Sequence, residues 1–392
     1  MLTKDKVCVV IPTGFDGGGT ATLGLEYSEL GYDTYFLKSS KGSSCNVGRN
    51  SVTTFKDTKE LLTIIEKYDR IILGLYYFRN NRADILDLSQ IKKVYPEKEV
   101  IYIDCYRGNY SLRKRAEDIL DKKYDVVWCL SPHIANEYIK LGQKAEVVDF
   151  NVYNWRNTGI IKSDDLDKKI ITVGRVAGVK GSINLLREAK LLSESNLTSD
   201  FYYIYEGLDY NVNKNGSVSM MPNLLESLVE SKSFSNKKTH DYLLLHGNFN
   251  NYNEELVTNR YNLFPTYNKE EGIQRWKHCK YGLMPYLGVG SHSKLSAYSH
   301  PECWNIAPEY CVYELSNVGV PILFSEDYAR RIGYNNSIFI YDKFDNVPNI
   351  VYNIERTDKA MYDINRKKQI QFFKDKSKEI REIINSKFLE EI

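Results

Sequence analysis

The chain has 392 residues, which is more than one hydrophobic core comfortably serves, so we expect two domains. Its hydrophobic content of 42%, charged content of 27% and net charge of +2 are ordinary for a globular protein. This balance neither demands nor forbids a nucleic-acid partner, because an evenly charged chain can still carry a local basic face. No apolar stretch approaches the roughly 20 residues that a membrane span needs, so we expect no membrane partner.

The cysteine usage points to reduced thiols. The seven cysteines are odd in number and include no C-x-x-C pair, so they signal neither a disulfide framework nor a zinc site. The first residues, "MLTKDK", run directly into an apolar stretch. We therefore expect no signal peptide and a cytoplasmic location.

The first unusual stretch is "GFDGGGTATLGLE" at 14–26, which follows the apolar run 6–12. A glycine-rich bend between a strand and a helix lets backbone N–H groups approach an anion at the positive end of the helix. Gly17, Gly18 and Gly19 are the candidates for this contact. The alternative is a flexible turn, and this stretch alone does not decide between the two.

The rest of the first half alternates short apolar runs with helix-like segments. The predicted strands are 6–12, 33–37, 70–78, 99–104, 125–131 and 145–150, and the clearest predicted helices are 111–123 and 132–142. Alternation of this kind predicts a doubly wound parallel sheet.

The rhythm breaks at 151–167, which is polar and without a clear period, and we place a linker there. It then restarts as a second α/β domain, with an irregular insertion expected at 208–240 and a helical tail from 358. The predicted strands are 169–175, 201–207, 242–248, 281–286, 321–326 and 337–342, and a helix is predicted at 182–193.

The most informative motif is "VGRVAGVKGSINLL" at 173–186. Arg175 and Lys180 lie in a predicted loop between a strand and a helix. The arginine can donate to two phosphate oxygens at once, and the lysine supplies a point charge. We interpret the pair as a diphosphate site. The alternative is a solvated basic loop.

Two further stretches carry candidate ligand contacts. In "APEYCVYELSNVGVPILFS" (307–325) a predicted helix carries Glu309 and Glu314, which can accept hydrogen bonds from sugar or ribose hydroxyls. The alternative is a surface helix with two solvated acids. In "LLLHGN" a strand ends at His246, Gly247 and Asn248, where backbone groups can face a nucleobase.

These three stretches together resemble the donor half of retaining, nucleotide-sugar-dependent GT-B glycosyltransferases. That family carries a G-R-x-x-x-x-K-G loop, here Gly174 to Gly181, and a late acidic helix followed by G-x-P, here Gly319 to Pro321. The order of "GFDGGGTATLGLE", "SLRKR", "GRVAGVKG", "YEGLDY", "HGN" and "PEYCVYELSNVG" is similar, more narrowly, to the DNA α-glucosyltransferases of T-even bacteriophages.

The resemblance implies an α/β GT-B fold of two Rossmann-like domains facing across a cleft. The expected divisions are an acceptor-side domain at 1–155, a nucleotide-sugar domain at 165–355 and a helical tail at 356–392. It also implies roles for individual residues. The donor diphosphate is held by Arg175 and Lys180 and faced by Gly17, Gly18 and Gly19. The donor nucleotide is bound by Glu206, His246, Gly247, Asn248 and Glu314. Glu309 lies near the phosphates or the sugar.

One departure from the phage pattern follows the fourth strand. A His/Asp-rich run is expected there, and this chain has "IDCYRGNY" instead. Asp104, at the end of that strand, is predicted to act as a base or to orient an acceptor hydroxyl. The alternative is a loop carboxylate paired with Arg107. Asp104 thus joins Arg175, Lys180 and Glu309 as the predicted catalytic set.

The resemblance further implies transfer of a sugar, expected to be glucose, from a UDP-sugar to a hydroxymethylated pyrimidine in double-stranded DNA. The predicted DNA contacts are Arg79, Arg82, Arg107, Arg113, Lys114 and Arg115. The alternative for residues 113–115 is a solvated helix start. The alternative function is a GT-B enzyme acting on a cell-wall polymer, glycan or protein. A non-catalytic binding module is disfavoured because the Arg175 and Lys180 pair is intact.

We expect no metal and no cofactor, since the two cations replace a metal at the diphosphate and no D-x-D motif lies in a suitable loop. We also expect a monomer, located in the host cytoplasm if the chain is phage-encoded.

Overall fold

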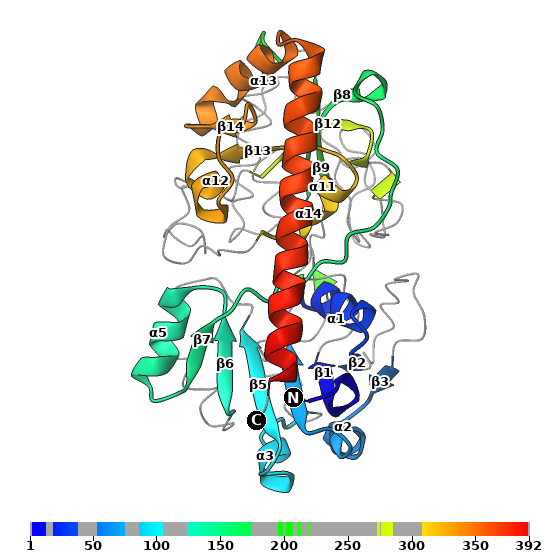
Figure 1. Ribbon diagram of the computed structural model, residues 1–392, viewed down its shortest axis with the longest axis vertical. Coiled ribbons are helices and arrows are strands. Elements are labelled where there is room, and N and C mark those ends of the chain that lie inside the picture. Colours follow the sequence, from blue (N-terminus) through cyan, green and yellow to red (C-terminus); the bar gives the residue numbers. More distant parts are fainter. Residues whose placement is uncertain are drawn as a thin grey trace. The chain divides into compact units, whose positions relative to one another are not determined.

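The computed structural model folds as two compact units (Figure 1). Unit 1 comprises Met1–Trp155, Glu302–Tyr310 and Asp375–Ile392, and unit 2 comprises Arg156–Pro301 and Cys311–Lys374. The residues that the structure describes are 2–12, 19–37, 53–74, 86–104, 124–173, 195–198, 201–206, 211–212, 218–219, 273–274, 276–284 and 308–390.

Unit 1 contains a seven-stranded sheet of order β3-β2-β1-β4-β5-β6-β7, in which every neighbouring pair is parallel. The parallel α/β architecture predicted from the alternating apolar runs is therefore confirmed. The strands are β1 (Val7–Ile11), β2 (Asp33–Leu37), β3 (Thr53–Phe55), β4 (Arg70–Gly74), β5 (Glu99–Asp104), β6 (Val126–Cys129) and β7 (Ala145–Val147).

Two helices of this unit begin at residues whose side chains cap them. The Asp57 side chain accepts a hydrogen bond from the Glu60 amide at 2.9 Å, and Ser131 caps a helix that opens with Pro132. The helices are α1 (Gly19–Glu29), α2 (Thr58–Ile65), α3 (Gln90–Val94) and α5 (Pro132–Lys140), with a 3-10 turn at Lys4–Lys6 before β1.

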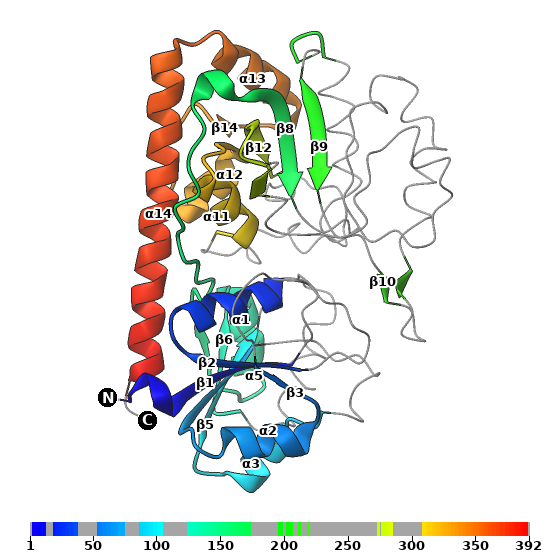
Figure 2. The same cartoon turned by 90° about the vertical axis from the view of Figure 1, so that its right-hand side faces the viewer.

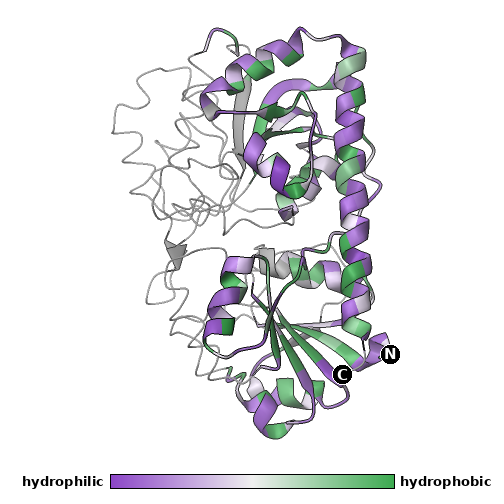
Figure 3. Cartoon of the chain, turned by 60° about the vertical axis from the view of Figure 1, so that its left-hand side comes forward, coloured by the Kyte–Doolittle hydropathy of each residue, from purple (hydrophilic) through white to green (hydrophobic). Residues whose placement is uncertain are grey.

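Alternation along each strand divides the core of unit 1 between the two faces of the sheet. Cys8 and Val10 of β1 belong to a buried cluster that also contains Leu61 of α2, Ile91 of α3 and Tyr138 of α5. The inner strands β1, β4, β5 and β6 consist almost entirely of buried residues, and Figure 3 colours the strands of this sheet largely as hydrophobic. A sheet covered on both faces needs such strands, and this is why they read as continuous apolar runs in the sequence.

The opposite face receives α1 and the last turns of α14 (Lys359–Leu389). The ring of Phe388 is fully buried, with its centroid 5.2 Å from that of Tyr27, 4.9 Å from that of Tyr32 and 5.7 Å from that of Trp128. Tyr32 also donates its hydroxyl to Asn385 at 2.8 Å. The end of α14 is thus part of the unit 1 core.

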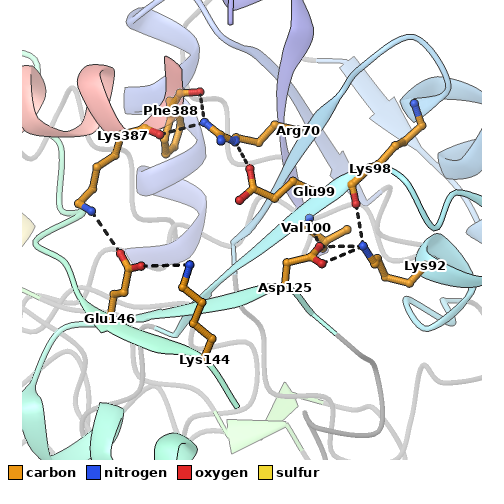
Figure 4. A network of polar contacts seen from close by, with 10 residues as sticks. All are labelled: Arg70, Lys92, Lys98, Glu99, Val100, Asp125, Lys144, Glu146, Lys387 and Phe388. Carbon is orange, nitrogen blue, oxygen red and sulfur yellow. Dashed lines mark hydrogen bonds and ion pairs between the residues drawn. The ribbon is translucent and has the colours of Figure 1, made fainter. Parts of the chain in front are cut away.

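A polar network holds the same helix end (Figure 4). Arg70, at the start of β4, is ion-paired with Glu99 and donates to the carbonyl oxygens of Lys387 at 3.0 Å and Phe388 at 2.7 Å. A cation at a helix C-terminus satisfies carbonyl groups that have no partner within the helix and complements the helix dipole. Lys387 extends the network to Glu146 at 3.2 Å.

Unit 2 contains a five-stranded sheet of order β14-β13-β12-β8-β9. All its pairs are parallel, and Figure 2 shows β8 beside β9. The strands are β8 (Asp167–Val173), β9 (Tyr202–Glu206), β12 (Cys279–Leu283), β13 (Ile322–Ser325) and β14 (Ile340–Tyr341), with β10 (Asn211–Val212) and β11 (Val218–Ser219) forming a separate antiparallel pair.

The helices of unit 2 are α11 (Tyr310–Asn317), whose first residue belongs to unit 1, α12 (Glu326–Ile332), α13 (Val347–Glu355) and the first half of α14. Short 3-10 turns lie at Ser163–Asp165 and Phe344–Asn346. Along α14, one buried stripe continues through both halves. Its fully or almost fully buried positions are Tyr362, Arg366, Gln369, Phe373, Ser377, Ile380, Ile384 and Phe388, spaced three or four residues apart.

Most predicted elements coincide with observed ones. The predicted helices 111–123 and 182–193 and the predicted strand 242–248 lie outside the described residues. The predicted helix at 307–319 is shorter than expected, since α11 spans Tyr310–Asn317. Residues 151–162 have no regular structure, as the predicted linker requires, and β8 begins at Asp167, inside the predicted range.

We expect Phe388→Ala to lower the free energy of unfolding by about 3–5 kcal/mol, because the substitution leaves a cavity among three aromatic rings. Ile383→Ala, on the same helix at a side chain that is 40% exposed, is the control and should cost less than about 1 kcal/mol. Urea unfolding followed by tryptophan fluorescence measures both. Equal losses would show that the end of α14 does not support unit 1.

Candidate functional site

The carboxyl edge of the unit 2 sheet brings two predicted donor-site segments together. Val173, the last residue of β8, is in register with Glu206, the last residue of β9. The Gly174–Gly181 loop begins directly after Val173, so its first residue follows the strand that neighbours Glu206. In open parallel sheets ligands bind at this edge, at the point where the strand order reverses, which here lies between β8 and β12.

Helix α11 lies against β12 at the same edge. The Cys311 sulfur lies 3.9 Å from the sulfur of Met284, the residue directly after β12. One turn later, Leu315 packs on Gly282, where an added Cβ would come within 3.0 Å of the leucine side chain. The first turn of α11 therefore lies at the carboxyl edge of the sheet, and its last turn lies toward the amino edge.

Both predicted acidic residues are buried, so the solvated-acid interpretation of this helix is wrong. Glu314 is 6% exposed and lies on α11 in unit 2. Glu309 is 7% exposed, directly precedes the helix and belongs to unit 1. A buried carboxylate carries a large desolvation cost and is therefore expected to have a specific partner.

The end of α11 is a Schellman motif. Gly319 has a φ of +86°, its amide donates to Ser316 O at 3.0 Å, and the Val320 amide donates to Leu315 O at 2.9 Å. A Cβ at Gly319 would lie 2.6 Å from Ile160. The "NVGVP" stretch therefore ends α11, and only glycine fits at position 319 of this turn.

Two other segments of unit 2 hold the turn between α11 and β13. From the linker, the Arg156 amide donates to the Asn317 side chain at 2.8 Å and Thr158 donates to Asn317 O at 2.7 Å. From α14, Arg366 donates to Gly319 O at 2.6 Å, and Gln369 bonds to both backbone groups of the first residue of β13. The sequence analysis missed these residues, because polar positions on a helix do not reveal what they contact.

In unit 1, Asp104 lies at the carboxyl end of β5 and is fully buried. The Tyr138 hydroxyl of α5 donates to its Oδ2 at 2.6 Å. This hydrogen bond fixes the carboxylate at the edge where the sequence predicted an acceptor-orienting group. Arg107, the alternative partner, lies outside the described residues.

The glycine-rich stretch contributes one position that the sequence analysis did not single out. Gly24 of α1 packs so closely on β1 and β2 that an added Cβ would lie 2.6 Å from Ile11 and 2.7 Å from Phe36. Gly24 therefore lets α1 approach the sheet, as the last glycine of a dinucleotide-binding fingerprint does. Two residues later, the Glu26 side chain is 1% exposed and accepts a hydrogen bond from the Asn154 main-chain amide at 2.8 Å.

The remaining candidates divide by whether the structure describes them. Gly19 is the first residue of α1. The others lie outside the described residues, namely Gly17, Gly18, Arg79, Arg82, Arg107, Arg113, Lys114, Arg115, Arg175, Lys180, His246, Gly247 and Asn248.

Among the residues that the structure describes, no three His, Cys, Asp or Glu side chains gather as metal ligands would. Within the same ranges, no helix has both the length and the apolar character needed to cross a membrane.

Comparisons with known proteins identify the fold. No protein-family model matches the sequence, and neither does any curated protein. Among solved structures, OtsA in its apo form has a TM-score of 0.60 and 10% identity, over 99% of this chain and 100% of that chain. A trehalose-6-phosphate protein from E. coli, bound with UDP-2-fluoro glucose, has a TM-score of 0.55 and 10% identity, over 98% and 99% of the two chains.

A third match is TarM from S. aureus in complex with Fondaparinux, alpha-GlcNAc-glycerol and UDP. Its TM-score is 0.50 and its identity 11%, over 86% of this chain and 60% of that chain. These neighbours are GT-B glycosyltransferases, and this chain has the GT-B fold, which confirms the predicted fold class. None of the three is a DNA-modifying enzyme by its description, so these matches do not support the narrower likeness to phage DNA glucosyltransferases.

We expect Gly319→Ala to destabilise unit 2 more than Gly333→Ala does. Both glycines have positive φ, +86° and +78°, so alanine at either position costs about 1–2 kcal/mol for the left-handed conformation. Gly333 has nothing within 4 Å of an added Cβ, whereas Gly319 also meets Ile160. The overpacking should add about 1–3 kcal/mol at Gly319 in urea unfolding. Equal losses would show that the turn has room for a side chain.

Proposed function

We propose that this chain is a retaining glycosyltransferase that transfers a hexose from a UDP-sugar to a hydroxyl group on a cell-wall polymer, glycan or protein. The observation that carries the proposal is the carboxyl edge of the unit 2 sheet. There the sequence G-R-x-x-x-x-K-G begins directly after Val173, which is in register with Glu206, and the first turn of α11 lies at the same edge, with the buried Glu314 on the next turn of that helix. The GT-B fold supports it, as do the UDP and UDP-sugar in the descriptions of two structural neighbours.

In this proposal the protein stabilises the leaving group. The bond from the anomeric carbon to the β-phosphate oxygen breaks, and the acceptor hydroxyl oxygen bonds to that carbon on the same face. The acceptor proton passes to a β-phosphate oxygen, and UDP leaves. Arg175 and Lys180 neutralise the charge that develops on the diphosphate, and Glu314 binds the ribose hydroxyls. The reaction then needs no metal, and EDTA should leave turnover unchanged.

The descriptions of the structural neighbours support a carbohydrate-type acceptor in this proposal. Two of the neighbours are described with a trehalose phosphate and with alpha-GlcNAc-glycerol, which are carbohydrate compounds. The DNA hypothesis rests on the resemblance to phage enzymes and on six basic residues outside the described part of the chain, namely Arg79, Arg82, Arg107, Arg113, Lys114 and Arg115. Since the neighbours support the first and nothing described supports the second, we favour a glycan-type acceptor.

Incubation of the protein with a panel of UDP-hexoses and several acceptor classes tests the assignment. The acceptors are polyol-phosphate polymers, oligosaccharides, peptides, and DNA containing 5-hydroxymethylcytosine. We expect UDP release with a mass gain of one hexose on a carbohydrate or polymer acceptor. A mass gain on DNA alone would replace the acceptor assignment, and no UDP release with any pair would overturn the proposal.

We expect Lys180→Ala to lower turnover at least a hundredfold, because removing one stabiliser of developing charge costs about 2.7–4 kcal/mol. Lys169→Ala is the matched control, since Lys169 lies near the start of β8 and its ion pair with Asp167 is partly exposed. Initial rates of UDP release measure both, with circular dichroism to confirm folding. Near-normal turnover in Lys180→Ala would remove the loop from the mechanism.

A further inference from the structure

Within unit 2, the buried stripe of α14 contains two large polar residues between Tyr362 and Phe373. Arg366 is 4% exposed and Gln369 is fully buried, although both residue types are usually found at protein surfaces. Their polar groups contact the turn from α11 to β13. A buried polar stripe needs an explanation, because leucine or methionine would fill the same space without desolvating polar groups.

Gln369 has a structural explanation. The Ile322 amide donates to its Oε1 at 2.6 Å, and its Nε2 donates to Ile322 O at 3.0 Å. Ile322 is the first residue of β13, and β14 begins to pair only at Phe324. The Gln369 amide therefore takes the place of a neighbouring strand before β14 begins.

Arg366 is different, because strand pairing does not require it. Its Nε donates to Gly319 O at 2.6 Å, and burial lowers the pKa of its guanidinium group. Within the described part of the chain, its Nη2 is buried without a hydrogen-bond partner. The Arg366 side chain therefore carries an incompletely compensated charge. Its contribution to the structure is the hydrogen bond to the carbonyl oxygen of Gly319, the glycine that ends α11.

The position of that glycine links Arg366 to Glu314. Gly319 is the left-handed residue of the Schellman motif, and the preceding amide, of Val318, donates to Glu314 O at 3.2 Å. The turn lies at the amino edge of the sheet, where β13 begins, whereas Met284 and Cys311 mark the opposite edge. Arg366 therefore cannot touch a donor bound at the carboxyl edge, and any effect on binding has to pass through α11.

We propose that Arg366 is a positioning residue for donor binding, which anchors the end of α11 and thereby fixes the place of Glu314. This inference rests on the proposed function, because it takes Glu314 as a ribose ligand. The bond to Gly319 O fixes the helix from its far end, together with the Thr158 bond to Asn317 O. Since both are hydrogen bonds to main-chain carbonyl groups, they set where the helix lies and leave its side chains unchanged.

The test is a double-mutant cycle read as UDP affinity, which needs neither the acceptor nor the sugar. Isothermal titration of the full chain with UDP is measured for wild type, Arg366→Met, Glu314→Gln and the double variant. We expect Arg366→Met to weaken UDP binding about tenfold, as loss of one charge-assisted hydrogen bond would. In the Glu314→Gln background the same change should weaken it less than about twofold, because non-additivity identifies residues that act through one another.

Tyr362→Phe is the control for a general loss of stability. Tyr362 lies on the same stripe, one turn before Arg366, and donates its hydroxyl to Lys280 O of β12 at 3.0 Å, so its loss removes a hydrogen bond to β12 and none to the α11 turn. It should lower the melting temperature and leave UDP affinity unchanged. The inference is overturned if Arg366→Met weakens UDP equally in both backgrounds, if it leaves affinity unchanged, or if Tyr362→Phe weakens it as much.

A second variant keeps the proposal testable if Arg366→Met does not fold. Thr158→Val keeps the shape of a partly buried side chain and removes its hydrogen bond to Asn317 O on the same turn. We expect it to weaken UDP binding about threefold in the wild-type background and not with Glu314→Gln. If wild type itself does not bind UDP, the proposed function fails. If wild type binds and neither variant depends on Glu314, only the positioning role fails.

Discussion

The structure depends on the burial of one face of a single 31-residue helix, α14. Its stripe supplies Ile380, Ile384 and Phe388 to the core of unit 1 and Arg366 and Gln369 to the α11 turn of unit 2. Both halves pack aromatic rings, Phe388 among Tyr27, Tyr32 and Trp128 in unit 1 and Phe373 against Tyr313 and Phe324 in unit 2. They differ in that the unit 2 half also carries Arg366 and Gln369, whose side chains bond to main-chain groups of the α11 turn and of β13.

That difference explains how the candidate site is supported. Within the described residues, Val173 and Glu206 end β8 and β9 at the carboxyl edge of the sheet, and the first turn of α11 lies at that edge beside Met284. The groups that hold α11 lie at the other edge, on the linker and on α14. Loops can therefore vary at the binding edge while the support stays within packed, hydrogen-bonded structure.

The sequence predicted the strands well because fully buried parallel strands leave continuous apolar runs, such as 6–12, 70–78 and 99–104 in unit 1. It also predicted a helix over most of α14, from composition and the absence of proline. It did not show that residues 375–392 belong to unit 1, because amphipathic spacing gives a buried face and not the surface on which that face packs. The acidic helix shows a similar limit, since the sequence did not distinguish buried from solvated Glu309 and Glu314.

The composition of unit 1 has a consequence for how the chain folds during synthesis. Its sheet is complete in sequence by β7, which ends at Val147, yet the space among Tyr27, Tyr32 and Trp128 is filled only by Phe388. On the ribosome, the nascent first sheet therefore exposes an aromatic surface while some 240 further residues are made. The core of unit 1 is therefore completed only after the last turns of α14 have been synthesised.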